Sequence, residues 1–376
     1  MSPVADTSES AALVRRQALT GASGPAALVK NSKVFGIACF ACLGGFVYGY
    51  NQGVFSGILT MTSFGKHMGP WVQDQTKKGW LTSIFELGAW FGCLYSGFLA
   101  ETLSRKRAIQ ANVVLFVIGV IIQCLSVVGG PSCMLAGRFV TGLAVGAMSV
   151  NVPNYNAEVA PPEVRGSLVA LQQLAITAGI MVSFWVDYGT NNIGGTGSSQ
   201  SDAAWLVPIC LQLIPGVALG VGLLFMPFSP RWLVHHDREA EARHVLSSLR
   251  NLEQDDGLIE LEFLEIKAQS LFEKRSTAIK WPHLVELTPW HTFKLQFVAI
   301  GSLFTTKAMF RRVIVATVTM FFQQFTGINA VLYYAPSIFA ALGTSSNTTS
   351  LLATGVVGVA MFLATIPAYF TCTTLQ

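Results

Sequence analysis

The stretch GGFVYGYNQGVFSG, Gly44–Gly57, lies inside a long apolar block, Val34–Leu59, and carries a neutral amide, Asn51, near the middle of that block. A helix that crosses a bilayer needs about 20 predominantly apolar residues, so this block is long enough to span one. Seven further blocks follow along the chain: Gly79–Leu99, Ile109–Val128, Met134–Asn154, Leu168–Tyr188, Ala203–Phe225, Val313–Tyr333 and Ser350–Phe370. The sequence therefore predicts an all-α membrane protein with eight transmembrane helices.

The composition agrees with this fold class. Of the 376 residues, 52% are hydrophobic and only 12% are charged, whereas a soluble domain carries about 25% charged residues. Glycine, with 35 residues, is plentiful within the apolar blocks, where it allows membrane helices to approach closely. Six of the seven cysteines, all but Cys133, lie in or beside a predicted span, so we interpret them as small packing residues. The pattern predicts no disulfide framework, no metal site and no cofactor.

The positive residues predict the orientation of the chain in the membrane. Twenty of the 24 Lys and Arg fall on one side of the predicted spans, and three fall on the other side. Without the long segment between spans six and seven, which counts weakly, eight still stand against three. Positive loops stay cytosolic, so we expect both termini in the cytosol, and we expect the sequon that begins at Asn347 on the outer side. No patterned basic face suggests a nucleic-acid partner.

The chain divides into four predicted parts. Residues 1–33, rich in Ser and Ala, are expected to form a disordered cytosolic tail without a cleavable signal, and residues 34–226 contain six spans. Residues 227–310 form a cytosolic helical linker, and residues 311–376 contain the last two spans. This order resembles the first eight spans of a transporter built from two six-helix halves.

Two helices are predicted within the linker. Asp237–Leu249 has Glu239 one turn before Arg243, a spacing that favours an ion pair along the helix. The next helix carries one apolar stripe, with its acids facing away, which we expect to pack beneath the membrane helices; the stripe consists of Leu258, Leu261, Leu264, Ala268 and Leu271. Phe293–Phe310 is apolar, but counting it as a span would reverse the orientation. We expect it to lie at the membrane interface.

Six motifs stand in a fixed order along the chain. After Gly44–Gly57 come GFLAETLSRK at Gly97–Lys106, Gly137-Arg138, NAEVAP at Asn156–Pro161 with Arg165-Gly166, MPFSPRWL at Met226–Leu233, and QQFTGIN at Gln323–Asn329 with Tyr333-Tyr334. Together they resemble the sugar porters of the major facilitator superfamily, and particularly the fungal monosaccharide branch. The chain departs from that pattern at Glu101, Thr102, Ser104 and Lys106, and at Phe228, which replaces an acid.

The QQFTGIN motif has a physical interpretation of its own. Primary amides both donate and accept hydrogen bonds, as sugar hydroxyls do, and Gln323, Gln324 and Asn329 place three of them at membrane depth. On an ideal helix these side chains would point at roughly 0°, 100° and 240°, too widely spread for one ligand. Gly327 offers a place where the helix can break so that they converge. The alternative is that the amides hydrogen-bond neighbouring helices to one another.

Further sugar contacts are implied by the resemblance. It matches Gln173 to a sugar-contacting glutamine of the fifth helix, Tyr48 to an aromatic residue near the sugar, and Tyr333 to the tyrosine pair that follows the seventh-helix amides. From the residues alone, Gln172 and Gln173 serve equally well as helix-packing amides. Met361 stands where many members have a sugar-binding asparagine.

Charged residues at the predicted inner ends of helices form a second group of candidates. The resemblance implies that they form ion pairs that hold the inner side closed while the outer gate is open; the group consists of Arg105, Glu158, Arg165 and Arg231. With Phe228 in place of the family's acid, we expect this clamp to be weaker than usual. Plain orientation charge is the alternative, although it explains Glu158 poorly.

Asn51 bears on energy coupling. In proton-coupled members, the resemblance places an aspartate at this position, opposite the arginine that matches Arg138, whereas facilitated glucose carriers have asparagine. An amide does not titrate, so Asn51 favours transport without proton coupling. Glu86, about 10 Å inside the second span, is the opposing candidate: a proton carrier, a counter-ion for Arg138 or a protonated acid. Asp187 is expected to be solvated at an outer helix end.

The sequence thus predicts a multi-pass plasma-membrane carrier of a monosaccharide, a hexose by resemblance, that works by alternating access and facilitated diffusion. No nucleophile–base set suggests an enzyme. Its predicted partners are a small sugar and the lipid bilayer. The alternatives are proton symport through Glu86, a sugar sensor, or a truncated product; as it stands, the chain is expected to transport poorly.

Overall fold

The computed structural model describes residues 31–161, 164–195, 197–282, 289–343 and 346–374, and these residues form helices and connecting turns without a strand. The predicted tail therefore lies almost entirely outside the described residues. Eight helical segments are long and apolar enough to cross a membrane. The eight predicted spans are confirmed.

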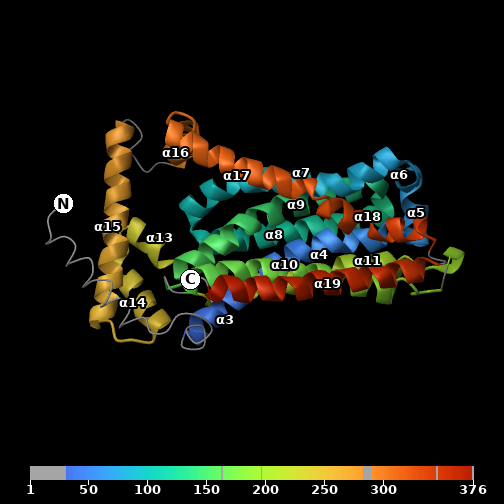
Figure 1. Cartoon of the computed structure of the whole chain (residues 1–376), viewed down its shortest axis with the longest axis horizontal. Helices are drawn as coiled ribbons and strands as arrows, with labels where there is room; N and C mark the ends of the chain where they lie inside the picture. Colours follow the sequence, from blue (N-terminus) through green and yellow to red (C-terminus); the bar gives the residue numbers. More distant parts are fainter. Residues whose placement is uncertain (1–30, 162–163, 196, 283–288, 344–345, 375–376) are drawn as a thin grey trace.

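The first six spans run back and forth along one bundle (Figure 1). They are α3 with α4 (Ser32–Ala41, Leu43–Ile58), α7 (Gln75–Leu103), α8 (Arg105–Cys124), α9 (Ser126–Val159), α10 (Arg165–Thr190), and α11 with α12 (Ala203–Leu211, Leu213–Phe225). Between them lie the short elements α5 (Thr62–Met68), α6 (Pro70–Gln73) and the 3-10 turn η2 (Gly197–Ser199). The last two spans are α17 with α18 (Lys307–Phe325, Ile328–Ala341), and α19 (Asn347–Thr374).

Close backbone contact between α4 and α10 explains why α4 is rich in glycine. Four glycines of α4 recur every fourth residue and so share one helix face that meets α10: Gly45, Gly49, Gly53 and Gly57. A Cβ atom on Gly49 would lie 1.9 Å from the backbone oxygen of Ile176. Only glycine fits such a contact. This arrangement of small residues is what brings membrane helices together without a hydrophobic driving force.

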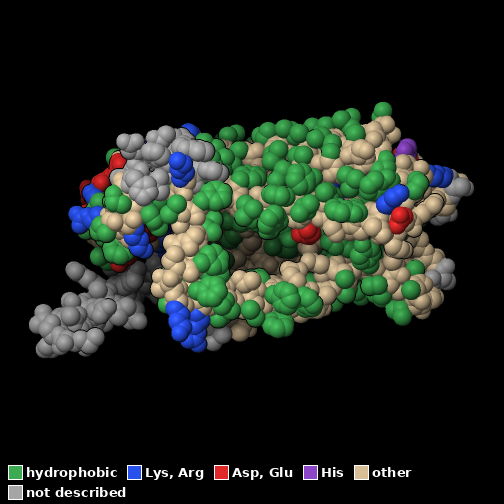
Figure 2. Space-filling model, turned by 90° about the horizontal axis from the view of Figure 1, so that it is seen from above, with side chains coloured by type: hydrophobic (Ala, Val, Ile, Leu, Met, Phe, Trp, Pro, Cys, Tyr) green, Lys and Arg blue, Asp and Glu red, His purple; other side chains and the backbone are tan. Residues whose placement is uncertain are grey.

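The last two spans are attached unevenly to the six-span bundle. Helix α19 packs along α10, and α18 packs against α4 and α19. Helix α17, in contrast, has no buried residue. Seen from the side on which α17 lies, the molecule is hollowed about midway along its length (Figure 2).

The linker helices lie at the end of the bundle where α3 begins and α19 ends (Figure 1). They are α13 (Pro230–His235), α14 (Glu239–Arg250), α15 (Gly257–Lys280) and α16 (Pro289–Ser302). Lys33 of α3 donates to the backbone oxygen of Ser248 in α14 at 2.6 Å. With 14 residues, α16 is about 21 Å long and too short to cross the bilayer. It is not among the eight candidate spans.

Two predictions about the linker are wrong. The expected pair between Glu239 and Arg243 does not form, because each side chain turns to α15: Arg243 binds Glu260, and Glu239 binds Lys267 at 2.8 Å. The expected apolar stripe of α15 is not its packing face either. Its buried residues are Ile259, Phe263 and Ser270, and three members of the stripe, Leu261, Leu264 and Leu271, are exposed. The helix is rotated toward α13 and α14, which it contacts.

Candidate functional site

The seventh span is broken at the predicted glycine. Helix α17 ends at Phe325, and α18 begins at Ile328 after Gly327, which has a φ of +76°, a left-handed conformation that glycine adopts without steric cost. The break brings amides together from both sides of it. Asn329 donates from Nδ2 to Oε1 of Gln324 at 2.9 Å. The prediction that Gly327 interrupts the helix is confirmed.

A third amide from the six-span bundle completes this cluster. Gln52 of α4 donates from Nε2 to Oδ1 of Asn329 at 2.9 Å. Gln52 is buried, Asn329 is half-buried and Gln324 is exposed, so the chain of hydrogen bonds runs from the bundle interior to an open surface. We call Gln52, Gln324 and Asn329 the amide cluster. Gln52 was not among the candidate site residues named from the sequence, although a second amide directly after Asn51 in an apolar span could have indicated it.

The other predicted sugar contacts lie outside the amide cluster. Gln323 is exposed on α17. Gln173 is exposed on α10, whereas its neighbour Gln172 is buried beside Gly45 of α4. Tyr48 is half-buried, and its ring centre lies 6.3 Å from that of Phe85. Within the described part of the chain, these side chains form no hydrogen bond to the cluster, so the structure brings together two of the predicted amides but not the full set.

Helix α18 makes a second polar contact with the bundle through Tyr333. The Tyr333 hydroxyl donates to Oε1 of Glu86 in α7 at 3.1 Å. Its neighbour Tyr334 lies 3.4 Å from Thr82 Oγ1, one turn before Glu86. Glu86 is therefore not an isolated carboxylate: it is one partner of a hydrogen bond that ties α7 to the helix after the break.

Arg138 is fully buried. Its guanidinium carbon lies 3.6 Å from the centre of the Phe55 ring and 5.3 Å from that of Phe85, where the aromatic faces attract a cation. Nη2 also approaches the backbone oxygen of Thr82 at 3.4 Å. Asn51, which was expected to lie opposite this arginine, donates from Nδ2 to the backbone oxygen of Val47 in its own helix at 3.0 Å.

The placement predicted for Asp187 is wrong. Its side chain is fully buried rather than solvated, and Oδ2 accepts a hydrogen bond from the backbone N–H of Gly57 at 3.2 Å. The reason is tertiary: the glycine face of α4 lies directly against the end of α10, and it covers a carboxylate that would otherwise reach water.

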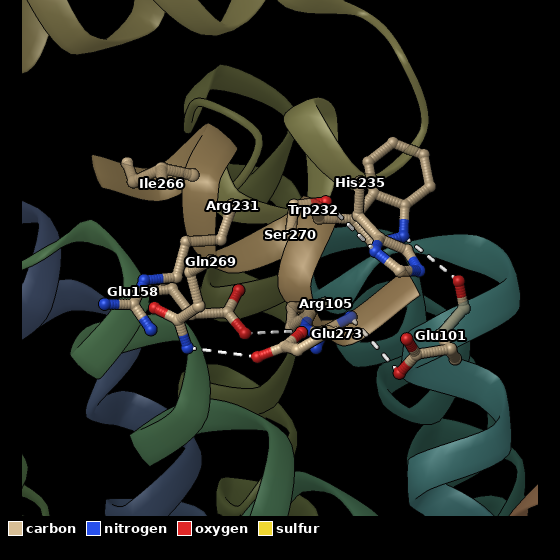
Figure 3. A pocket seen from close by; sticks show the side chains of 10 residues that line it. All are labelled: Glu101, Arg105, Glu158, Arg231, Trp232, His235, Ile266, Gln269, Ser270 and Glu273. Carbon is tan, nitrogen blue, oxygen red and sulfur yellow. Dashed lines mark hydrogen bonds and ion pairs between the residues drawn. The ribbon is translucent and has the colours of Figure 1, made fainter. Parts of the chain in front are cut away.

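Three of the four predicted clamp residues meet in one cavity of about 170 Å³ beneath the bundle (Figure 3). Arg105 Nε donates to Glu158 Oε1 at 2.9 Å and also lies 3.8 Å from Glu101. Arg231 of α13 lines the same cavity. The fourth, Arg165, begins α10 and does not line this cavity. The ion pair joins α8 to α9, so in this structure it lies within the six-span bundle.

The linker helices close the other side of this cavity. Trp232 donates from Nε1 to the backbone oxygen of Glu101 at 3.1 Å. Gln269 and Glu273 of α15 are joined by a 3.0 Å hydrogen bond (Figure 3). Sequence reasoning did not single out Trp232, although it lies within the MPFSPRWL motif, or the two α15 residues, which no motif marks.

Phe228, where the resemblance implied an acid, lies beside three cations. Lys106 Nζ lies 4.8 Å from its ring centre, and the guanidinium carbons of Arg107 and Arg238 each lie 5.6 Å away. Lys106 also donates to the backbone oxygen of Met226 at 2.7 Å. The aromatic face of Phe228 therefore offers these cations a partner.

Two linker groups have perturbed pKa values. Burial lowers the pKa of His235, which lines the cavity, below its usual 6.5. The hydrogen bond from Lys274 lowers the pKa of Asp237 below 3.8.

Among the described residues, no group of three or more His, Cys, Asp or Glu side chains is placed to hold a metal ion.

Comparison with known sequences decides the family. The profile of the family described as sugar (and other) transporters matches residues 37–374. The chain belongs to this family. It is accordingly an integral, multi-pass, all-α membrane protein of a transporter family, with the first six spans and two further spans of the major facilitator fold.

Several relatives within the family resemble the chain over most of its length. It is 33% identical over 316 residues to the MFS glucose transporter mfs1 of Aspergillus flavus, covering 83% of this chain and 55% of the relative. It is 35% identical over 335 residues to the glucose transporter GlcP of Staphylococcus epidermidis (89% and 65%), and 32% identical over 350 residues to a quinate permease of Neurospora africana (90% and 60%). The chain thus spans 55 to 65% of the length of these relatives.

A solved structure supports the fold. The partially occluded, inward-open form of the xylose transporter XylE from E. coli is 25% identical to this chain and superposes with a TM-score of 0.70, covering 90% of this chain and 71% of that protein.

Proposed function

We propose that the protein carries a monosaccharide, a hexose in the first instance, across the plasma membrane by alternating access and facilitated diffusion. The observation that carries this proposal is the amide cluster at a broken helix. Gln324 and Asn329 converge across the Gly327 break, and Gln52 connects them to α4.

The chemistry of this cluster suits a neutral polyol. Each sugar hydroxyl is both donor and acceptor, and each amide offers both functions in a fixed plane. The Gln324 amide is exposed and keeps hydrogen-bonding capacity beyond its bond to Asn329. Gln173, Gln323, Tyr48 and Tyr333 are proposed as further contacts that close around the sugar as the helices move.

The names of the relatives also support a sugar. Two of them are glucose transporters, and XylE is a xylose transporter. Another relative is a quinate permease, so quinate, a carboxylate that carries several hydroxyl groups, is the competing candidate substrate. The three side chains of the cluster are uncharged and offer no cation to a carboxylate, so we favour the neutral sugar.

The cavity beneath the bundle is proposed as the inner gate. Arg105, Glu158 and Arg231 line this cavity. Arg165, the first residue of α10, follows Glu158 by seven positions in the chain. We propose that residues 227–310 form a cytosolic linker, that residues 34–226 and 311–376 belong to two transmembrane halves, and that both termini are cytosolic. The positive charges support this orientation, and they cluster with the linker.

Coupling to protons is not needed for this mechanism. Asn51 does not titrate, and its amide is bonded to its own helix, so the position that would carry the proton is neutral. A second candidate is proton symport through Glu86. The Tyr333–Glu86 hydrogen bond favours it, because protonating Glu86 would change a contact between α7 and α18, which belong to different proposed halves.

Equilibrium binding tests the substrate. Purified protein in detergent is incubated with labelled glucose, and unlabelled glucose, xylose or quinate is added as competitor. The proposal predicts that the two sugars displace the label and that quinate does not. Displacement by quinate at lower concentration than by either sugar would refute the choice of a neutral ligand.

Sugar-induced proton uptake tests the coupling. The protein is mixed with saturating glucose in weakly buffered solution that contains a pH-indicating dye. Facilitated diffusion predicts no proton uptake in either the wild type or Glu86→Gln. Uptake by the wild type that disappears in Glu86→Gln would establish the symport alternative instead.

A further inference from the structure

Two thiols from different helices lie side by side at the end of the bundle opposite the linker. Cys124 is the last residue of α8, and Cys210 lies within α11. Their Sγ atoms are 3.5 Å apart, although the residues are 86 positions apart in the chain. The packing of α11 against α8 brings them together.

The other described thiols have different neighbours. Cys42 Sγ accepts a hydrogen bond from Asn156 Nδ2 at 3.3 Å, and Cys93 Sγ lies 3.4 Å from the backbone oxygen of Gly146. Cys133 lies beside Gly129 in its own helix. Within the described residues, Cys124 and Cys210 are the pair whose contact joins two sulfur atoms.

This pair can be reached by a small oxidant. Cys210 is exposed and Cys124 is half-buried. Cys210 also lines an apolar groove of about 410 Å³ along α11, with Leu206 and Ile214. A small neutral oxidant such as hydrogen peroxide can enter such a groove.

We propose that Cys124 and Cys210 form an oxidisable dithiol, closed to a disulfide by peroxide. The Cys210 thiolate attacks one peroxide oxygen, the O–O bond breaks, and the products are a sulfenic acid and, after protonation, water. The Cys124 thiolate then attacks the sulfenic sulfur, and hydroxide leaves and is protonated to a second water. The two thiols lose two electrons and two protons in total, and one peroxide is reduced to two waters.

Movement of less than two ångströms is needed to close the bond, since the sulfurs are 3.5 Å apart and a disulfide is about 2.05 Å long. Both helices belong to the six-span bundle, so the bond would fasten α8 to α11 and leave the contacts of α18 untouched. A link across 86 positions would also restrict the unfolded chain. The oxidised protein should therefore melt at higher temperature than the reduced one.

Thiol counting tests the proposal on the full chain. Reduced protein should give seven maleimide-reactive thiols after denaturation, which is its cysteine content, and peroxide-treated protein should give five. Trypsin cleaves after Arg107, Arg138, Arg165 and Arg231. The oxidised sample should therefore contain a reductant-sensitive link between peptides 108–138 and 166–231.

Single substitutions identify the sulfurs. Cys210→Ser should keep all six of its thiols after peroxide, whereas Cys124→Ser should lose at most the Cys210 thiol, as an unresolved sulfenic acid. Neither variant should form the link or gain thermal stability. Cys133→Ser, which alters the other cysteine in peptide 108–138, should still lose two thiols and form the link. The proposal is overturned if the wild type keeps seven thiols under peroxide, or if the link forms in Cys124→Ser through Cys133.

Discussion

Gly49→Ala tests whether close backbone contact between α4 and α10 holds the bundle together. The added Cβ would lie 1.9 Å from the backbone oxygen of Ile176, whereas an ordinary contact begins at 3.4 Å. The two helices must therefore separate by roughly 1.5 Å, because a backbone oxygen cannot swing aside as a side chain can. Overpacking of this kind costs about 1–3 kcal/mol, and a backbone contact places this site near the upper value.

The expected result is a large loss of thermal stability. A loss of about 3 kcal/mol, at about 2–4 °C per kcal/mol for a chain of several hundred residues, lowers Tm by about 6–12 °C. The assay is thermal unfolding of the detergent-purified protein, followed by tryptophan fluorescence. Gly36→Ala in α3 is the matched control, because its Cβ would have no neighbour within 4 Å. A Tm for Gly49→Ala within about 2 °C of the control would show that the contact between α4 and α10 is not close enough to exclude a methyl group.

Three further predictions concern the inner end of the bundle. Arg105→Ala should lower the free energy of unfolding, measured by chemical denaturation, by about 1–3 kcal/mol. The reason is that Glu158 stays largely buried but loses its 2.9 Å partner. The double variant Arg105→Ala/Glu158→Gln should regain most of this loss. Phe228→Leu should lower the free energy of unfolding by about 0.5–1 kcal/mol, because the contact between the ring and Lys106 is lost. Phe228→Tyr keeps an aromatic face and should lower it less. Equal losses in the two variants would contradict the cation–aromatic contact. Burial lowers the pKa of His235 below 6.5, so the unfolded chain takes up this proton first as the pH falls, and stability is lost between 6.5 and the lower folded value. The Tm of the wild type should therefore fall more than that of His235→Asn between pH 7.5 and 5.5. Plots of Tm against pH that run parallel for the two proteins would show that His235 does not cause the loss of stability.

The sequence was sufficient for features that depend on local properties of the chain. Span length and apolar content are one-dimensional, so all eight spans were predicted. The break at Gly327 was predicted for the same reason, since a left-handed turn between two helical segments needs a glycine.

Features that depend on how helices are rotated against one another were not predictable in this way. Arg243 had an acid one turn before it in its own helix, but the packing of α14 on α15 gave it Glu260. Asp187 lay at a helix end, and only the tertiary contact with Gly57 buries it. Gln52 was missed because its partner, Asn329, lies 277 positions away.

Sugar binding by Asn329→Leu tests the central claim most directly, that the amide cluster is the site that binds the monosaccharide. Asn329 hydrogen-bonds to both Gln52 and Gln324, so its replacement removes one amide and frees the other two. Gln212→Leu is the control, because Gln212 is a buried amide outside the cluster. Equilibrium binding of labelled glucose should weaken at least about tenfold in Asn329→Leu, equivalent to about 1.4 kcal/mol, and should stay unchanged in Gln212→Leu. Equal affinity in the two variants and the wild type would contradict the account.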